Sequence, residues 1–178
     1  LSWDFSNLHT CDIDPVWDRL IESYLADVLK NKASHRGWKI PETTLVYPWI
    51  LRKFPDAKYI HWIRDPRDSI LRQHKTDDLA DFGIAYPATE DIRERRAISW
   101  FYQYQLMKAT PTPESVITVR FEDFVLNQEE TLQRLEEFLG IPLARIIVRK
   151  DPVGRWKADT EKHEFDFFNE AMKEQGYA

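Results

Sequence analysis

Residues 58–68 read KYIHWIRDPRD, and the class of fold follows from this stretch. The aromatic and β-branched residues of 58–63 predict a buried strand. Asp65 and Pro66 predict that a helix begins directly after it, since a carboxylate caps a first turn and proline fits the first helical position. Arg64 stands between the two elements, where a bidentate guanidinium beside free helical N–H groups can hold a phosphate. The alternative is an Arg–Asp ion-pair cluster that only stabilises the turn, a kind of contact that contributes about 0–1 kcal/mol when exposed.

Helices and strands alternate on both sides of this stretch. Apolar spacing and end signals predict further helices over 14–31, 43–51, 89–107, 127–138 and 159–173, and further strands over 38–40 and 115–120. This alternation predicts one α/β domain over residues 1–178, with a parallel β-sheet flanked by helices on both faces.

Three cations stand at the ends of the three predicted strands: Lys39, Arg64 and Arg120. In a sheet of this kind, ligands bind beyond the carboxyl ends of the strands. The positions of these three cations therefore suggest a binding site for an anionic ligand. The alternative, that each is a surface charge that happens to end a strand, is about equally well supported.

Composition excludes several classes of function. The 178 residues are 43% hydrophobic and carry a net charge of −5, which disfavours general binding to a nucleic-acid backbone. The single cysteine, Cys11, excludes an internal disulfide framework and a multi-cysteine zinc site, and it fits a reducing, cytoplasmic compartment. No apolar run approaches the roughly 18 residues of a membrane span, and the histidines show no metal-ligand spacing, so we expect neither a span nor a metal.

A second basic segment lies near the C-terminus. Residues 149–157 read RKDPVGRWK and show little periodicity. Gly154 allows close approach of the backbone to a ligand, so the segment can fold over an anion. Taken alone, the segment is more readily explained as a solvated surface loop.

Three segments of the sequence follow one another along the chain: FPDAKYIHWIRDPRD, VITVRFEDFVLNQEETLQRLEEFLGIP and RKDPVGRWK. Together they resemble the PAPS-dependent sulfotransferases (PAPS is 3′-phosphoadenosine 5′-phosphosulfate), from about Trp38 to the end of the chain. The resemblance implies a P-loop NTPase-like three-layer sandwich. It also implies sulfuryl transfer from PAPS to a hydroxyl or amine of a small molecule, glycan or peptide, with adenosine 3′,5′-bisphosphate as product and no metal.

The resemblance assigns donor-binding roles residue by residue. Arg64 would bind the 3′-phosphate, and Arg149 and Lys150 would close over that phosphate. Phe121 stands where the family often has Tyr beside the adenine, so its ring would stack on the base. Arg72 stands where the family usually has a phosphate-binding Ser, and would itself contact the phosphate.

The resemblance also suggests catalytic residues. Lys39, within WKIP, would stabilise the bridging oxygen of the leaving phosphate. Pro41 stands where cytosolic members have a catalytic His, so Glu42 is the expected base. A carboxylate from a segment outside this sequence is the alternative.

The family's phosphosulfate loop, of the type PKSGTTW or PRSGTT, has no counterpart in the sequence. We therefore expect an N-terminally truncated sulfotransferase that has little or no activity by itself. One alternative is a non-catalytic nucleotide-binding module. Another is a P-loop kinase relative, which the absence of G-x-x-x-x-G-K-[ST] disfavours.

Overall fold

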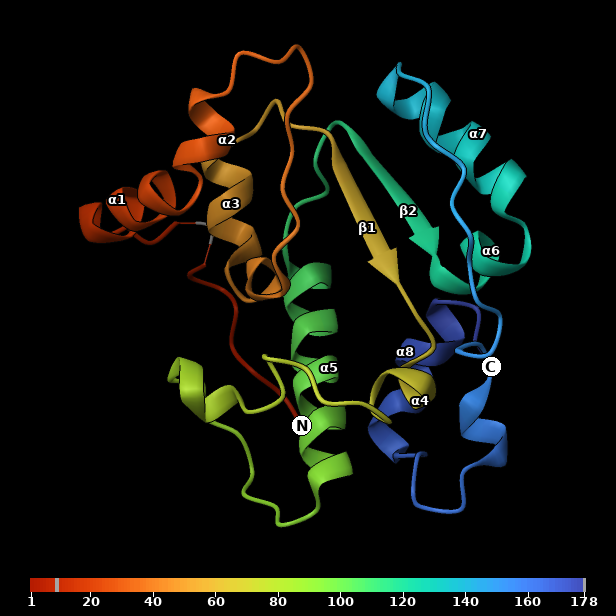
Figure 1. Cartoon of the computed structure of the whole chain (residues 1–178). Helices are drawn as coiled ribbons and strands as arrows, with labels where there is room; N and C mark the ends of the chain where they lie inside the picture. Colours follow the sequence, from red (N-terminus) through yellow and green to blue (C-terminus); the bar gives the residue numbers. More distant parts are fainter. Residues whose placement is uncertain (9, 178) are drawn as a thin grey trace.

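A pair of parallel strands lies at the centre of the fold in the computed structural model, which describes residues 1–8 and 10–177 (Figure 1). Strand β1 (Tyr59–Ile63) pairs with β2 (Val116–Arg120), in a register that sets Ile63 beside Arg120. Between them the chain passes through α4 (Pro66–Ser69), the 3-10 turn η2 (Leu79–Phe82) and the long helix α5 (Ile92–Ala109). Parallel pairing through this crossover brings both carboxyl ends to one edge of the sheet.

Helices flank both faces of the sheet, as predicted. On one face, Val119 packs against Leu132 and Leu135 of α7 (Gln128–Leu139), which follows α6 (Phe121–Leu126). On the other face, the rings of Tyr59 and His61 contact Tyr47 at the start of α3 (Tyr47–Lys53). The predicted α/β class with a parallel sheet is therefore confirmed.

The N-terminal helix begins where the sequence predicts, because Asp14 accepts a hydrogen bond from the Val16 N–H at 2.7 Å. It is interrupted at Leu25, so α1 (Pro15–Tyr24) and α2 (Ala26–Lys30) replace one longer helix. Leu25, whose side chain is buried, has φ of −96° and ψ of 9°, which departs from regular helical geometry. A 3-10 turn, η1 (Pro41–Val46), then leads into α3.

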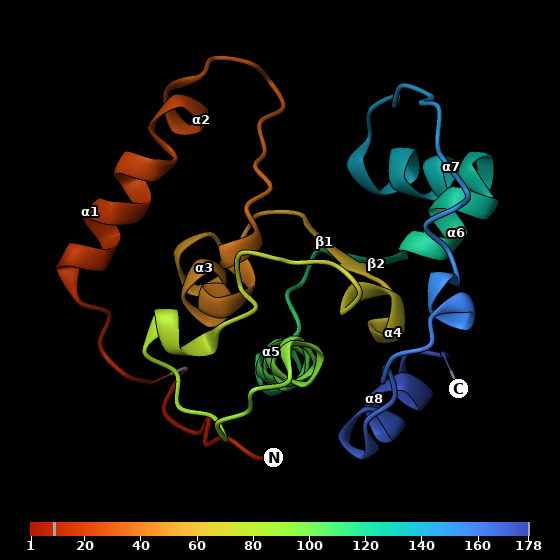
Figure 2. The ribbon, with the colours of Figure 1, turned by 60° about the horizontal axis from the view of Figure 1, so that its bottom comes forward.

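Helix α5 runs between the N-terminal helices and the C-terminal segment, and Figure 2 shows it nearly end-on. Asp91 caps its first turn, accepting from the N–H groups of Arg93 and Glu94.

The C-terminal segment adds η3 (Arg155–Ala158), η4 (Asp166–Phe168) and α8 (Asn169–Glu174). Its aromatic residues form a core with α4 and α5 that contains Ile70, Ala97, Phe165, Phe168, Met172 and Tyr177.

Two expectations about strands are wrong. Residues 38–40 do not join the sheet, which has two strands among the described residues; Ile40 is extended but has no ladder partner. Strand β1 is also not buried on both sides, because Ile60 and Trp62 are 41% and 48% exposed. In the part of the chain that the structure describes, β2 is the one strand beside β1, so the other edge of β1 has no neighbouring strand.

The predicted helix over 159–173 is also wrong over its first half. Arg93 of α5 binds both oxygens of Asp159, at 2.8 and 3.0 Å, and reaches Glu161 at 2.9 Å. These ion pairs hold the segment in an irregular path beside α5, and helix α8 begins only at Asn169. Among the described residues, no helix is both long and apolar enough to span a membrane.

Candidate functional site

The site is built at the carboxyl end of β1, where Arg64 leaves the sheet. Its guanidinium lies over the ring of Phe121, 4.5 Å from the ring centre, and Nη2 donates to the carbonyl oxygen of Pro152 at 2.5 Å. The carboxylate of Asp68 lies 3.8 Å from the same Nη2. The Nε of Arg64 is buried and has no hydrogen-bond partner among the described residues.

The turn after Arg64 is held by Asp65. Its Oδ1 accepts the Arg67 N–H at 2.9 Å, and its carbonyl oxygen accepts the N–H groups of Asp68 and Ser69. Arg67 in turn donates to both carboxylate oxygens of Asp65, at 3.0 and 2.9 Å. Helix α4 has only four residues, and these N–H groups are already bound. The free helical N–H groups expected from the sequence are therefore not available, and an anion here would be held by side chains.

The basic segment 149–157 folds onto this turn, although it lies far away in the sequence. Trp156 packs beneath Arg67, whose guanidinium carbon is 3.9 Å from the ring centre. Gly154 has φ of +73°, in the left-handed region that favours glycine, and so lets the chain reverse over α4. Residues 152–156 of the segment are therefore attached to the turn that carries Arg64.

Charged groups of both signs surround Arg64. Burial lowers the pKa of Arg64 first of all, and the nearby cations Arg155 and Arg72 lower it further. Asp68 and Glu122 act in the opposite direction. Arg155 also has a buried Nε without a partner among the described residues. A cluster of this kind, with unpaired buried donors, is typical of a site for an anion.

The structure brings some of the predicted donor-binding residues together. Phe121 contacts Arg64 directly, and Arg72 is exposed but near enough to lower the pKa of Arg64. Arg149 turns outward, with 82% of its side chain exposed, and binds Asp151 at 2.9 and 3.3 Å. Lys150 is also exposed.

Arg155, which was not among the predicted site residues, lies near enough to Arg64 for its positive charge to lower the pKa of that guanidinium. Its place in the same basic segment was the available signal. Arg120, the other predicted strand-end cation, stacks on Tyr177 at 4.2 Å.

The two predicted catalytic residues lie on the segment before α3. Lys39 is exposed, and Glu42, in η1, has Lys75 at 4.0 Å as an ion-pair partner. Neither lines the cavity described next, although Pro41 and Thr44 beside them do.

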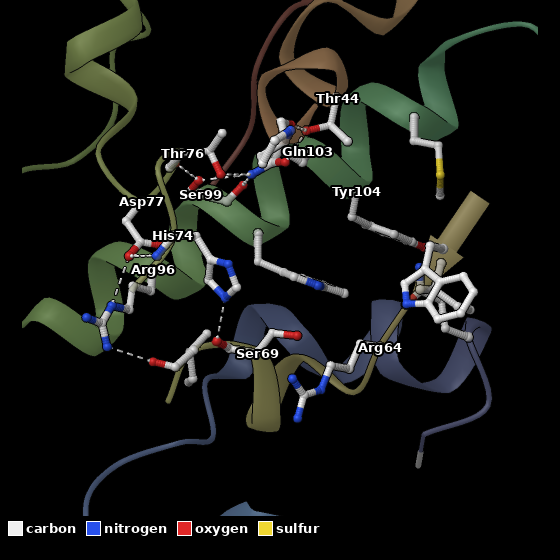
Figure 3. A pocket seen from close by; sticks show the side chains of 17 residues that line it. Thr44, Arg64, Ser69, His74, Thr76, Asp77, Arg96, Ser99, Gln103 and Tyr104 are labelled. Carbon is white, nitrogen blue, oxygen red and sulfur yellow. Dashed lines mark hydrogen bonds and ion pairs between the residues drawn. The ribbon is translucent and has the colours of Figure 1, made fainter. Parts of the chain in front are cut away.

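A cavity of about 280 Å³ extends from Arg64 between η1, α4 and α5 (Figure 3). Its wall includes the parallel rings of Trp100 and Tyr104, 5.6 Å apart. The ring of His74 also lines it, with Nε2 3.1 Å from the Ser69 carbonyl oxygen. Because a carbonyl oxygen only accepts, Nε2 carries the proton in this contact. Arg64, the two stacked aromatic rings and the His74 imidazole therefore line the same cavity.

Comparison with known proteins identifies the family. Residues 7–145 match the model of the sulfotransferase family, a range that includes Arg64 and Phe121 and ends before the basic segment. The chain is 23% identical over 155 residues to a Caenorhabditis elegans protein assigned as a protein-tyrosine sulfotransferase, covering 84% of this chain and 58% of that one. It is 24% identical over 132 residues to the omega-hydroxy-beta-dihydromenaquinone-9 sulfotransferase of Mycobacterium bovis, covering 71% and 34%. The chain thus spans less than two thirds of the length of either relative.

The fold gives the same result. The structure superimposes on the sulfotransferase domain from the curacin biosynthetic pathway with a TM-score of 0.67, covering 89% of this chain and 68% of that domain at 16% identity. The resemblance read from the sequence motifs is confirmed, and the chain belongs to the sulfotransferase family.

Proposed function

We propose that this chain forms the 3′-phosphate half of a PAPS site, in an enzyme that transfers a sulfuryl group to a hydroxyl or amine. The observation that carries the proposal is the state of Arg64. Its guanidinium is half-buried, its Nε has no hydrogen-bond partner among the described residues, and the positive charges of Arg155 and Arg72 lower its pKa. A doubly charged 3′-phosphate would supply the missing acceptors and offset the repulsion among the three guanidinium groups.

The remaining donor contacts follow from the same arrangement. One face of the Phe121 ring is covered by Arg64, and we assign the remaining ring surface to stacking against the adenine. Arg149 and Lys150 would close over the phosphate once Arg149 exchanges Asp151 for a phosphate oxygen. The complete enzyme would then have the three-layer sandwich of the family, with this two-stranded sheet as part of a larger one.

The reaction in this proposal is an in-line transfer. The acceptor oxygen or nitrogen forms a bond to sulfur, the bond from sulfur to the phosphate oxygen breaks, and adenosine 3′,5′-bisphosphate leaves. Lys39 stabilises the negative charge on the leaving oxygen, and Glu42 accepts the proton of the acceptor. Both side chains lie on one short segment next to Pro41 and Thr44, which line the cavity that reaches Arg64. No counterpart of the phosphosulfate loop occurs in the 178 residues, so for this chain the proposal covers the 3′ half of the donor.

A calorimetric titration of the chain with adenosine 3′,5′-bisphosphate, with AMP as the comparison ligand, tests the proposal. We expect tighter binding of the bisphosphate, and an Arg64→Gln variant that loses this preference by about 10- to 100-fold, since a hydrogen bond to a charged group contributes about 1.5–3 kcal/mol. Arg52→Gln is the matched control, because Arg52 also donates to one carbonyl oxygen, that of Cys11 at 2.8 Å, but lies outside the site. Equal affinity for the two nucleotides in the wild-type chain would refute the proposal.

A non-catalytic nucleotide-binding module is the second candidate. It is favoured by the position of Lys39 and Glu42 outside the cavity that contains Arg64. The two candidates differ in turnover: a module binds the bisphosphate but transfers no sulfuryl group, even when the protein carries a phosphosulfate loop.

A further inference from the structure

Asp68 is a fully buried carboxylate that joins two distant parts of the chain. It lies in α4, with 0% of its surface exposed. Its Oδ2 accepts the Gly154 N–H at 2.6 Å, and its Oδ1 accepts the Trp156 N–H at 3.0 Å. A buried carboxylate is tolerated only where donors satisfy it, and here the donors are backbone groups of the basic segment.

These two hydrogen bonds enclose Arg155. Because the N–H groups on both sides of Arg155 are bound to one carboxylate, the backbone of this residue has a defined position relative to α4. Arg64 is tied to the same unit, since Pro152 accepts its Nη2 proton at 2.5 Å and Asp68 lies 3.8 Å from that nitrogen. Asp68 thus lies beside Arg64 and binds the backbone on both sides of Arg155, so it contributes to the position of both arginines.

We propose that Asp68 is the positioning residue of the phosphate site. By binding the backbone of segment 152–156, it holds this segment against α4. Arg64 and Arg155 are thereby kept near each other, so that one phosphate can bind both. This assignment rests on the proposed function. Asp68 itself does not touch the phosphate in this proposal, because each of its oxygens already faces a backbone N–H.

Substitution of Asp68 distinguishes a specific role in holding segment 152–156 from a general contribution to the stability of the fold. Asparagine has one side-chain oxygen, so it satisfies one of the two N–H groups and turns its own NH2 toward the other. Alanine satisfies neither. The segment has a second, independent attachment in the stacking of Trp156 on Arg67, so loss of the hydrogen bonds to Asp68 loosens it without detaching it.

The experiment compares Asp68→Asn and Asp68→Ala with the wild-type chain in two measurements. Hydrogen exchange followed by mass spectrometry reports the protection of residues 152–157 and does not depend on any ligand. Calorimetry with adenosine 3′,5′-bisphosphate and with AMP reports the preference for the 3′-phosphate. Asp78→Asn is the matched control: Asp78 is also a capping carboxylate with an arginine partner, Arg95 at 3.2 Å, but it caps η2.

We expect a graded series. Exchange in residues 152–157 should rise at least about tenfold in Asp68→Ala and less in Asp68→Asn, and the dissociation constant for the bisphosphate should rise in the same order by about tenfold or more. AMP affinity and the exchange of α7 should stay unchanged, as should all measurements in Asp78→Asn. If Asp68→Ala does not fold, Asp68→Asn alone carries the comparison.

Two results would overturn the assignment: unchanged protection of the segment in the Asp68 variants, or a loosened segment that binds the bisphosphate as tightly as the wild type. A wild-type chain that does not distinguish the bisphosphate from AMP is a different failure. It removes the proposed function and the positioning role with it, while the exchange data still show whether Asp68 fastens the segment.

Discussion

The guanidinium of Arg64 lies over the ring of Phe121, 4.5 Å from the ring centre. Arg64 follows the last residue of β1 and Phe121 follows the last residue of β2, and the register that sets Ile63 beside Arg120 brings the two together. The contact orients the guanidinium edge toward α4 and the basic segment. A residue predicted to hold a phosphate and one predicted to stack on adenine therefore form one unit.

The first prediction concerns Phe121. Phe121→Leu keeps an apolar side chain but removes the cation–π contact, worth about 0.5–2 kcal/mol, so bisphosphate affinity should fall about 2- to 30-fold. Phe121→Tyr keeps the ring and should bind as tightly as the wild type. Calorimetry on the three proteins measures this difference, and equal affinities of the Leu and Phe forms would show that the ring has no part in binding.

The second prediction concerns Arg67, which stabilises the turn. It binds both oxygens of Asp65, donates to the Tyr177 carbonyl oxygen at 2.8 Å and covers Trp156. Arg67→Ala leaves Asp65 largely buried without its cation, and should lower the free energy of unfolding by about 2–4 kcal/mol.

Urea denaturation measures this change. Arg67→Lys should recover less than half of the loss, because an ammonium group cannot form the planar fork or the stack. The exposed Arg52→Ala serves as control and should stay within about 0.5 kcal/mol of the wild type. A full recovery by lysine would mean that charge alone matters at this position.

The third prediction concerns His61 and pH. Burial lowers the pKa of His61 from its ordinary 6.5, and burial raises the pKa of Tyr47 to about 12, so the Tyr47 hydroxyl stays protonated and can donate to His61 Nε2 across 2.9 Å. Protonation of His61 would place an N–H donor at Nε2 opposite the hydroxyl donor of Tyr47, so this hydrogen bond would be lost unless the hydroxyl turns.

The sign follows from the depressed pKa. Well above pH 6.5 the imidazole is neutral in both states and contributes no pH dependence. As the pH falls below 6.5, the unfolded chain takes up the proton first, so stability declines until the pH passes the lower pKa of the folded state. Thermal denaturation between about pH 7.5 and 5.5 should show a flatter dependence in His61→Gln, and the wild-type slope in the exposed control His35→Gln. Equal slopes in all three proteins would remove His61 as the cause.

The fourth prediction concerns Phe168, which seals the C-terminal core. It is 0% exposed, and its ring contacts Trp100 of α5 edge-on at 5.2 Å. Phe168→Ala should lower the free energy of unfolding by about 3–5 kcal/mol, whereas Phe82→Ala, at a position 40% exposed, should have a small effect. Urea denaturation of both variants provides the comparison, and similar losses would contradict the assignment of Phe168 to the core.

Much of the fold could be predicted because its signals are local. Asp14 and Asp65 cap helices as expected, and Gly140 ends α7 with φ of +76°. The strand 58–63 and the helix over 128–139 follow from residue type and spacing. The family could also be predicted from three motifs, because they occur in the order typical of the family.

Other features depend on contacts that no local pattern contains. Residues 159–161 could not be placed from the sequence, because Arg93, which lies 66 residues before Asp159, holds them beside α5. The exposure of Ile60 and Trp62 depends on which strands stand next to β1.

The sequence by itself determined most of the elements, the family and the turn that carries Arg64, because caps, periodicity and motif order act over a few residues. The tertiary structure alone decided which cations lie near Arg64. Asp68 binds the backbone N–H groups on both sides of Arg155, whose charge lowers the pKa of Arg64, while Asp151 binds the exposed Arg149. The physical reason is that a buried carboxylate must be satisfied, and the donors that satisfy it lie 86 and 88 residues further along the chain.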